Sequence, residues 1–169
     1  MSWRLDSRRR WILLGLAVLA LALQALLDAT RAPVRQRDYA LKLAAAERAA
    51  EAFQVLRARR QLVDAQVDML NDPAGTGLVG PEFSQITNAT GSLDAKLTSL
   101  NPNWAAILVD YFRQLGLRQG APVAIAISGS FPGINIGLFA AIETMRLRPV
   151  VITSVGASMW GANDPSFTW

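Results

Sequence analysis

Small polar residues and glycines gather at two points in the C-terminal half of the chain, each directly after an apolar run. Residues 128–130 read Ser-Gly-Ser, and residues 154–158 read Ser-Val-Gly-Ala-Ser. Glycine lets a ligand approach the backbone closely, and free amides at the start of a following helix attract carboxylate or phosphate groups. With the polar pair at 163–164 added, the predicted ligand-binding residues are Ser128, Gly129, Ser130, Ser154, Gly156, Ser158, Asn163 and Asp164.

These residues also have a plain structural interpretation, because turns between a strand and a helix commonly carry glycine and hydroxyl groups. Ligands of parallel α/β sheets bind beyond the carboxyl ends of the strands. Two such loops after consecutive strands therefore favour a binding crevice over ordinary turns.

Serine catalysis is a second hypothesis for the same region. Ser130 lies at a strand–turn–helix junction, but Ser128 and Pro132 occupy positions where the nucleophile-elbow pattern has glycine. The chain has no histidine, so a serine nucleophile would need a lysine base. The candidate catalytic residues are Ser130, Ser99 and Lys96, and nothing in the sequence shows that they meet.

Composition excludes several other functions. There is no cysteine and no histidine, which excludes disulfides, thiolate catalysis, histidine triads and cysteine–histidine metal sites. The acidic residues are scattered, so we predict no metal site and no cofactor. The net charge of +4 comes almost wholly from arginine, much of it near the apolar N-terminal segment, and no nucleic-acid-binding motif accompanies it. Nucleic acid is therefore not an expected partner.

The elements that would position these loops are the most regular part of the sequence. Residues 122–128 and 148–155 are continuous apolar runs typical of buried strands, and residues 133–145 between them predict a helix. A further helix is expected from the Asn-Pro pair at 101–102 to Leu115, ended by Gly116. Strands without polar alternation that flank a helix indicate a βαβ unit in a parallel sheet covered on both faces.

Two strands do not make a stable parallel sheet. Earlier residues, a partner, or sequence beyond Trp169 would have to complete it. Residues 76–99 are rich in Gly, Thr and Ser and predict an ordered surface segment.

A long helix is predicted over residues 36–70, ended by the Asn-Asp-Pro-Ala-Gly sequence at 71–75. Its expected apolar stripe consists of Leu43, Ala50, Phe53, Leu56, Val63, Val67 and Leu70. This amphipathic helix either forms a stalk or coiled coil, or packs on the C-terminal domain.

Residues 11–27 are uncharged and apolar, and with the residues up to 30 they are long enough to cross a hydrocarbon core about 30 Å thick. Arginines at 8–10 precede them, so the positive-inside rule predicts a cytoplasmic N-terminus (residues 1–10) and an external body. A cleaved signal peptide is the rival, with a poor cleavage pattern. A buried soluble helix fits less well, because the segment is apolar on all sides.

The sequence thus predicts an α/β protein: a transmembrane signal-anchor at residues 11–30, an amphipathic helix at 36–70 and an αβαβ parallel-sheet domain at 71–169. From about Gly77 onward it resembles the poly-gamma-glutamate system protein family, a membrane-associated component of bacterial polyglutamate capsule systems. The matching segments are Gly80-Pro81-Glu82-Phe83, Gly91-Ser92-Leu93 with Ala95-Lys96, Thr98-Ser99 with Asn101-Pro102, Ile-Ser-Gly-Ser-Phe-Pro at 127–132, and Ser-Val-Gly-Ala-Ser-Met-Trp-Gly-Ala-Asn at 154–163.

The resemblance implies a role in making, exporting or anchoring poly-γ-glutamate at the bacterial inner membrane. The expected partners are the membrane, other subunits of a polyglutamate synthesis or export complex, and the anionic polymer itself. Members of the family continue beyond the equivalent of Trp169, so this chain would correspond to their N-terminal portion. Three hypotheses follow: a binding accessory subunit, an envelope hydrolase or transferase of γ-glutamyl bonds, and a structural stalk.

Overall fold

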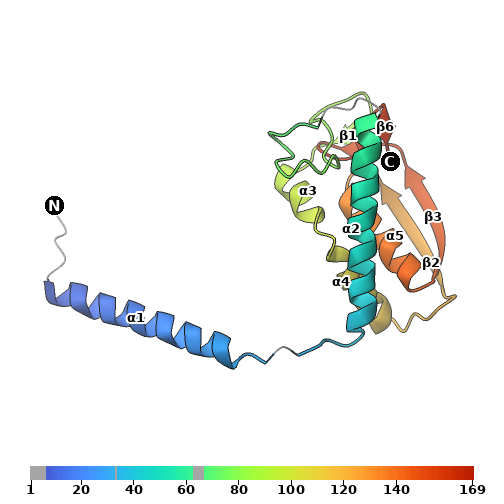
Figure 1. Ribbon diagram of the computed structural model, residues 1–169. Helices are drawn as coiled ribbons and strands as arrows, with labels where there is room; N and C mark the ends of the chain where they lie inside the picture. Colours follow the sequence, from blue (N-terminus) through green and yellow to red (C-terminus); the bar gives the residue numbers. More distant parts are fainter. Residues whose placement is uncertain (1–6, 33, 63–66) are drawn as a thin grey trace. The chain divides into compact units, whose positions relative to one another are not determined.

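The computed structural model describes residues 7–32, 34–62 and 67–169 (Figure 1). The chain divides into two compact units, Met1–Gln36 and Arg37–Trp169. The first unit holds α1 (Ser7–Thr30), and the second holds every other element.

Helix α1 contains the predicted apolar segment. Its stretch Arg9–Thr30 is the one helix among the described residues that is long and apolar enough to cross a membrane, and none of it is buried within the structure. The interpretation of this segment as a buried soluble helix stays a third alternative. The choice between a retained anchor and a cleaved signal peptide stays a prediction.

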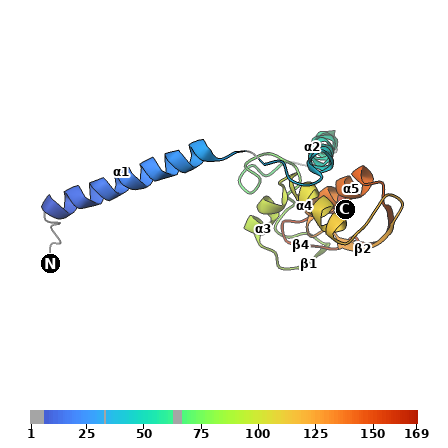
Figure 2. The ribbon, with the colours of Figure 1, turned by 90° about the horizontal axis from the view of Figure 1, so that it is seen from below.

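In the second unit, α2 (Tyr39–Leu62) packs against α4 (Trp104–Gln114) and α5 (Pro132–Thr144). Figure 2, which looks nearly along α2, shows these three helices side by side. Of the two alternatives for the amphipathic helix, packing on the C-terminal domain is therefore the one observed.

The predicted extent of that helix is wrong at its C-terminal end. We predicted residues 36–70, but α2 ends at Leu62, and residues 67–70 are not helical. The Val63 position of the expected stripe lies outside the described residues. Asp68 accepts hydrogen bonds from the backbone amides of Leu70 and Asn71, so its side chain stabilises a turn in place of another helical turn.

The buried face of α2 also differs from the expected leucine stripe. Leu43 is 44% exposed, whereas Ala45, Ala46 and Ala49 are buried. Small side chains allow close approach of α2 to its neighbours, which is why the alanines and not the larger residues face the core. Leu56 and Phe53, which we placed on the stripe, are half-buried.

The predicted βαβ unit is confirmed. Strand β2 (Pro122–Ser128) runs parallel to β3 (Arg148–Ser154), and α5 connects them. The two strands pair in continuous register from Pro122 opposite Arg148 to Ser128 opposite Ser154.

The sheet is not covered on both faces, contrary to our prediction. In β2, Ile125 is buried against the helices, while Ala124 and Ala126 on the opposite face are exposed. Every residue of β3 is exposed, and Ile152 is 75% exposed. Among the described residues, no third strand joins this sheet.

Residues 76–99 hold more structure than the surface segment that we expected. Strand β1 (Thr87–Ala89) pairs in parallel with β4 (Ala157–Ser158), and α3 (Leu93–Ser99) follows it. β1 is thus an earlier strand, but it pairs with the loop after β3 and does not extend the sheet of β2 and β3. The hairpin of β5 (Asn163–Asp164) and β6 (Phe167–Thr168) ends the described chain.

Helix α4 begins later than its sequence suggested. We expected it to begin at the Asn-Pro pair at 101–102, but the helix starts at Trp104, and Asn101 accepts a hydrogen bond from the amide of Asn103 in the turn before it. Gly116 ends the helix as predicted, with a φ of +75° that favours glycine. The hydrophobic core lies between α2, α4, α5 and one face of β2, and its buried members are Ala45, Ala49, Ala105, Val109, Phe112, Ile125, Ala140, Ala141, Ile142, Met145 and Leu147.

Candidate functional site

Helix α3 places Lys96 beside the loop that follows β2. Ser92 caps the helix by accepting a hydrogen bond from the amide of Ala95, which satisfies one of its free N–H groups. The helix turns Lys96 and Ser99 inward, and the Lys96 side chain is only 2% exposed. A lysine buried to this degree is unusual and calls for polar partners.

Those partners come from both of the loops singled out in the sequence. The Nζ atom of Lys96 donates a hydrogen bond to Oγ of Ser158 at 2.7 Å and another to the carbonyl oxygen of Ser130 at 2.5 Å. It also lies 3.7 Å from the centre of the Phe131 ring, a cation–π contact. Lys96 therefore links the loop after β2 to the loop after β3.

No carboxylate pairs with this lysine in the part of the chain that the structure describes, where the ion pairs join other side chains. Burial without a counter-charge penalises the ammonium form and lowers the pKa of Lys96 below the usual lysine value. The side chain can thus release its proton more readily than a surface lysine.

Three serines form a chain of hydrogen bonds beside Lys96. The Ser128 hydroxyl donates to Oγ of Ser130 at 3.1 Å, and the backbone amide of Ser158 donates to the same oxygen at 3.0 Å. Asn135, in the first turns of α5, donates from its side chain to the carbonyl oxygen of Ser128 at 2.8 Å. The polar ends of the two loops are thereby held against each other.

Two close approaches require glycine here. A Cβ on Gly133 would lie 2.5 Å from the carbonyl oxygen of Ser99, so glycine lets the end of α3 contact the start of α5. A Cβ on Gly91 would lie 2.5 Å from the carbonyl oxygen of Met159 and 3.3 Å from Oγ of Ser158. Both glycines therefore bring α3, and with it Lys96, into the serine loops.

Ser99, one of the two candidate nucleophiles, does not face the lysine amine. Its hydroxyl donates to the backbone carbonyl oxygen of Lys96 at 2.6 Å, and the residue is 4% exposed. The other candidate, Ser130, contacts Nζ only through its own carbonyl oxygen. Ser158, which we predicted as a ligand-binding residue, holds the hydroxyl that the amine contacts.

Ser154 and Gly156 do not join this cluster. Ser154 is exposed at the end of β3, and its hydroxyl donates to the carbonyl oxygen of Gly156 at 3.3 Å. Gly129 is buried and accepts a hydrogen bond at its carbonyl oxygen from the amide of Ala162. The ligand-binding roles of these residues stay predictions.

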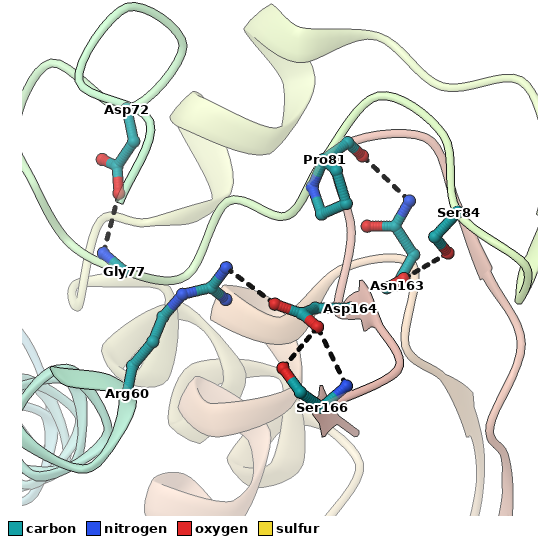
Figure 3. Close-up of polar contacts among 8 residues, drawn as sticks. All are labelled: Arg60, Asp72, Gly77, Pro81, Ser84, Asn163, Asp164 and Ser166. Atoms are coloured by element: carbon teal, nitrogen blue, oxygen red, sulfur yellow. Dashed lines mark hydrogen bonds and ion pairs between the residues drawn. The ribbon is translucent and has the colours of Figure 1, made fainter. Parts of the chain in front are cut away.

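Asn163 and Asp164 are engaged in contacts that hold the terminal loops together (Figure 3). The buried amide of Asn163 donates to Oγ of Thr87 and to the carbonyl oxygen of Pro81, and its backbone carbonyl oxygen accepts from Ser84. These bonds fix the segment before β1 against the hairpin of β5 and β6.

Asp164 pairs with Arg60, whose side chain is 5% exposed, across 3.4 Å. Burial alone would raise the pKa of Asp164, but hydrogen bonds from Ser166 and the charge of Arg60 outweigh it and lower the pKa. Asp72, also drawn in Figure 3, is fully buried and accepts from the amide of Gly77. Both carboxylates thus stabilise loops in this structure.

A hollow of about 430 Å³ borders the serine cluster. It is lined by Ala126, Ile127, Ser128, Phe131, Ile134 and Asn135. One serine of the cluster, the asparagine that bonds to it and the aromatic ring that contacts Lys96 therefore form part of its wall. Three further hollows lie against α2 and α5, at the terminal hairpin, and at Arg113 and Arg146, and none of these three is lined by Lys96.

Sequence reasoning missed Phe131, Asn135 and the pairing of Lys96 with Ser158. The lysine carried a weak signal, because it is one of only two in the chain and lies in a short segment rich in small residues. In comparisons with known proteins the chain matches no family model, no curated protein and no solved structure. The resemblance to the polyglutamate family therefore stays an expectation.

Proposed function

We propose that this chain is a membrane-anchored component of a poly-γ-glutamate capsule synthesis and export system, and that its α/β domain binds the anionic polymer. The observation that carries the proposal is Lys96, a buried cation with no carboxylate partner among the described residues. Its charge is not neutralised locally, so an anionic group is attracted to the serine loops beside it.

The binding region of the proposal is the hollow beside the cluster. Ser128 presents a hydroxyl there, and the start of α5 presents the positive end of a helix dipole. Phe131 occupies the cap position of α5, and its side chain makes no hydrogen bond to the helix. The first backbone amides of α5 are therefore not occupied by a capping side chain. A carboxylate of the polymer would accept hydrogen bonds from the Ser128 hydroxyl and the first amides of α5. The positive charge of the buried Lys96 would attract it electrostatically.

The anchor gives the proposal its location. Helix α1 is long and apolar enough to cross a bilayer, and the arginines before it favour a cytoplasmic N-terminus. We therefore place the domain outside the cytoplasmic membrane of a bacterium as a single-pass protein. Other subunits of the polymer machinery would be its partners there.

The direct test measures binding of poly-γ-glutamate to the full-length protein in detergent micelles by calorimetry at low and high salt. The substitution is Lys96→Met, and Lys42→Met is the matched control. Lys42 is the chain's other lysine, and it pairs with Asp110 at 2.6 Å, away from the serine loops. Both variants lose one positive charge, so a general electrostatic effect would weaken both equally.

We expect the Lys96 variant to lose about tenfold or more in affinity, the scale of one charge-assisted contact, and the Lys42 variant to keep most of it. Circular dichroism of both variants controls for folding. Equal weakening of both variants, or no binding by the unaltered protein, would contradict the proposal. In cells, a deletion strain that makes normal capsule polymer would contradict the broader role.

A further inference from the structure

We propose that Ser158 is a nucleophile for acyl transfer, with Lys96 as its general base, and that the cluster accepts the acyl group of an ester or amide. The Lys96 Nζ and Ser158 Oγ atoms are 2.7 Å apart, inside the range over which a base takes a proton from a hydroxyl. Both side chains are buried, at 2% and 7% exposure. This activity goes beyond the binding role proposed above and does not depend on it.

The contacts select Ser158 from the serines of the cluster. The hydroxyl of Ser99 is directed to a backbone carbonyl oxygen, and that of Ser128 to Ser130. The hydroxyl oxygen of Ser130 accepts from the backbone amide of Ser158 and makes no described bond to the lysine. Only Ser158 meets the requirement that nucleophile and base lie within hydrogen-bond reach.

The surroundings of Lys96 suit a base that changes its protonation state. When the amine is neutral, it keeps one N–H bond to the carbonyl oxygen of Ser130 and turns its lone pair to the Ser158 hydroxyl. When it takes up the proton, the face of Phe131 stabilises the new charge at 3.7 Å. Desolvation lowers the pKa of Lys96, so the neutral form is reached at lower pH than in a surface lysine.

Three segments hold the pair in place, so the geometry does not depend on one flexible loop. The Ser158 backbone is fixed by the pairing of β4 with β1 and by the hydrogen bond that its amide donates to the Ser130 hydroxyl oxygen. Lys96 is fixed by α3, whose C-terminal residue Ser99 closely approaches Gly133 of α5, while Gly91 before the helix closely approaches Met159. A preorganised nucleophile and base reduce the entropy lost on reaching the transition state.

The proposed reaction has two balanced steps. Neutral Lys96 takes the proton of Ser158, Oγ forms a bond to the carbonyl carbon of the substrate, and the bond from that carbon to the leaving alcohol or amine breaks as Lys96 returns the proton to it. In the second step, water or an acceptor amine attacks the acyl-serine ester, Lys96 takes its proton, and Ser158 receives that proton as the ester bond breaks. No metal or redox partner is needed.

The substrate would enter from the hollow beside the cluster, whose wall includes Ser128 and Phe131. Phe131 is 39% exposed and covers the lysine, so its ring separates the amine from water at that side. Exclusion of water strengthens the electrostatic effect of the lysine on the nucleophile.

The test is labelling of the full-length protein in detergent micelles with a fluorophosphonate, which forms a covalent bond with activated serines and releases fluoride. Peptide mass spectrometry identifies the labelled residue, and the rate is followed from pH 6 to 10. The variants are Ser158→Ala, Lys96→Arg and Ser130→Ala. Ser166→Ala is the matched control, because Ser166 is an exposed serine bonded to Asp164 and not to the lysine.

We expect the label on Ser158, none above background in Ser158→Ala, and a rate about 100-fold lower in Lys96→Arg, the size of a general-base contribution. Lys96→Arg keeps the charge and removes the base, so it separates base catalysis from charge alone. The rate of the unaltered protein should rise with pH, and Ser166→Ala should react at the same rate. No labelling, labelling of another serine, or a Lys96→Arg rate equal to that of the unaltered protein would overturn the proposal.

The binding role and the acyl-transfer role use opposite protonation states of Lys96, so the pH dependence of the two tests distinguishes them. Polymer binding needs the ammonium and should weaken as pH rises, whereas labelling of Ser158 needs the neutral amine and should become faster. If Ser158 is labelled but the protein does not bind the polymer, the acyl-transfer proposal stands and the polymer-binding proposal is overturned. If the protein binds the polymer but is not labelled, the polymer-binding proposal stands and the acyl-transfer proposal is overturned.

Discussion

The amine of Lys96 lies 2.7 Å from the hydroxyl of Ser158 although the two residues are 62 positions apart in the chain. The contact joins a helix of seven residues to a strand of two residues, neither of which is a prominent element of the fold. It also leaves a lysine buried without a carboxylate among the described residues. The first prediction tests the energetic consequence of that burial.

Stability should increase with pH in a way that depends on Lys96. Its pKa is lower in the folded protein than in the unfolded chain, so between the two values the unfolded chain binds more protons. The burial penalty is therefore fully present below the folded pKa and is relieved as pH rises toward the ordinary lysine value of about 10.4. Thermal unfolding of the full-length protein, followed by tryptophan circular dichroism from pH 7 to 10, measures this.

Lys96→Met removes the titrating amine and is the comparison that isolates it, because every other ionisable group is present in both proteins. As pH rises, the free energy of unfolding of the unaltered protein should increase relative to that of Lys96→Met. A difference that is constant with pH would show that Lys96 titrates alike in the folded and unfolded chains.

Adding a methyl group at Gly133 should be far more harmful than adding one at Gly137 on the same helix. A Cβ at Gly133 would lie 2.5 Å from the Ser99 carbonyl oxygen, whereas one at Gly137 would lie 3.3 Å from the Ala105 amide nitrogen. We expect Gly133→Ala to destabilise the domain by about 1–3 kcal/mol through overpacking. Gly137→Ala should be nearer neutral because alanine favours the helix.

Denaturant titration of the two variants gives both values under the same conditions. Gly133→Ala should also slow any labelling of Ser158, because α3 carries Lys96 and must move away from α5. Equal stability of the two alanine variants would contradict the close approach described for Gly133.

Loss of the Asp164 carboxylate should destabilise the domain more than loss of the Glu143 carboxylate. Asp164 faces Arg60, whose side chain is 5% exposed, whereas Glu143 faces the half-exposed Arg48. Removing one partner of a buried pair leaves an uncompensated charge, and we expect roughly 1–3 kcal/mol for Asp164→Asn at this partly exposed position. Glu143→Gln should change stability by less than about 1 kcal/mol.

Denaturant titration at pH 7 again measures both. The pKa of Asp164 is lowered in the folded state, so its contribution is present above the ordinary aspartate value and is lost as pH falls through the lowered one. The gap between the unaltered protein and Asp164→Asn should therefore narrow in acid. A larger effect for Glu143→Gln would contradict the assigned burial.

Strand β3 should promote self-association of the purified protein. Val150 and Ile152 are 65% and 75% exposed on an apolar strand that has no neighbour on its outer side among the described residues. Exposed apolar edge strands are sites of non-native pairing. Val150→Thr with Ile152→Thr should reduce association in light scattering while changing stability by roughly 0.5 kcal/mol or less. Scattering unchanged by the pair would refute this.

The N-terminal residue of the mature protein distinguishes an anchor from a signal peptide. We expect protein extracted from membranes to begin before Arg9, because residues 26–29, Leu-Leu-Asp-Ala, lack the small-residue pattern of a cleavage site. N-terminal sequencing measures this directly. A first residue after Ala29 would show that α1 is removed.

Local patterns predicted the elements that depend on local rules. The apolar runs of β2 and β3, the helix between them and the glycine that ends α4 all lie close to their predicted positions. The short strands and α3 were not predicted. A helix of seven residues such as α3 has little periodicity, and its stability comes from Ser92 and from contacts at Gly91 and Gly133.

The candidate site divides in the same way. The sequence by itself determined that serines and glycines follow two strands of one βαβ unit, and that an apolar helix precedes the domain. Strands and helices are recognisable from the pattern of apolar residues that are close together in the sequence. Only the tertiary structure decided that the Lys96 amine meets the hydroxyl of Ser158 and not the hydroxyls of Ser130 or Ser99. It also decided that Asn163 and Asp164 hold loops together. Those outcomes depend on contacts across 62 to 104 positions, which are set by the packing of α3 and the terminal hairpin and which no local pattern records.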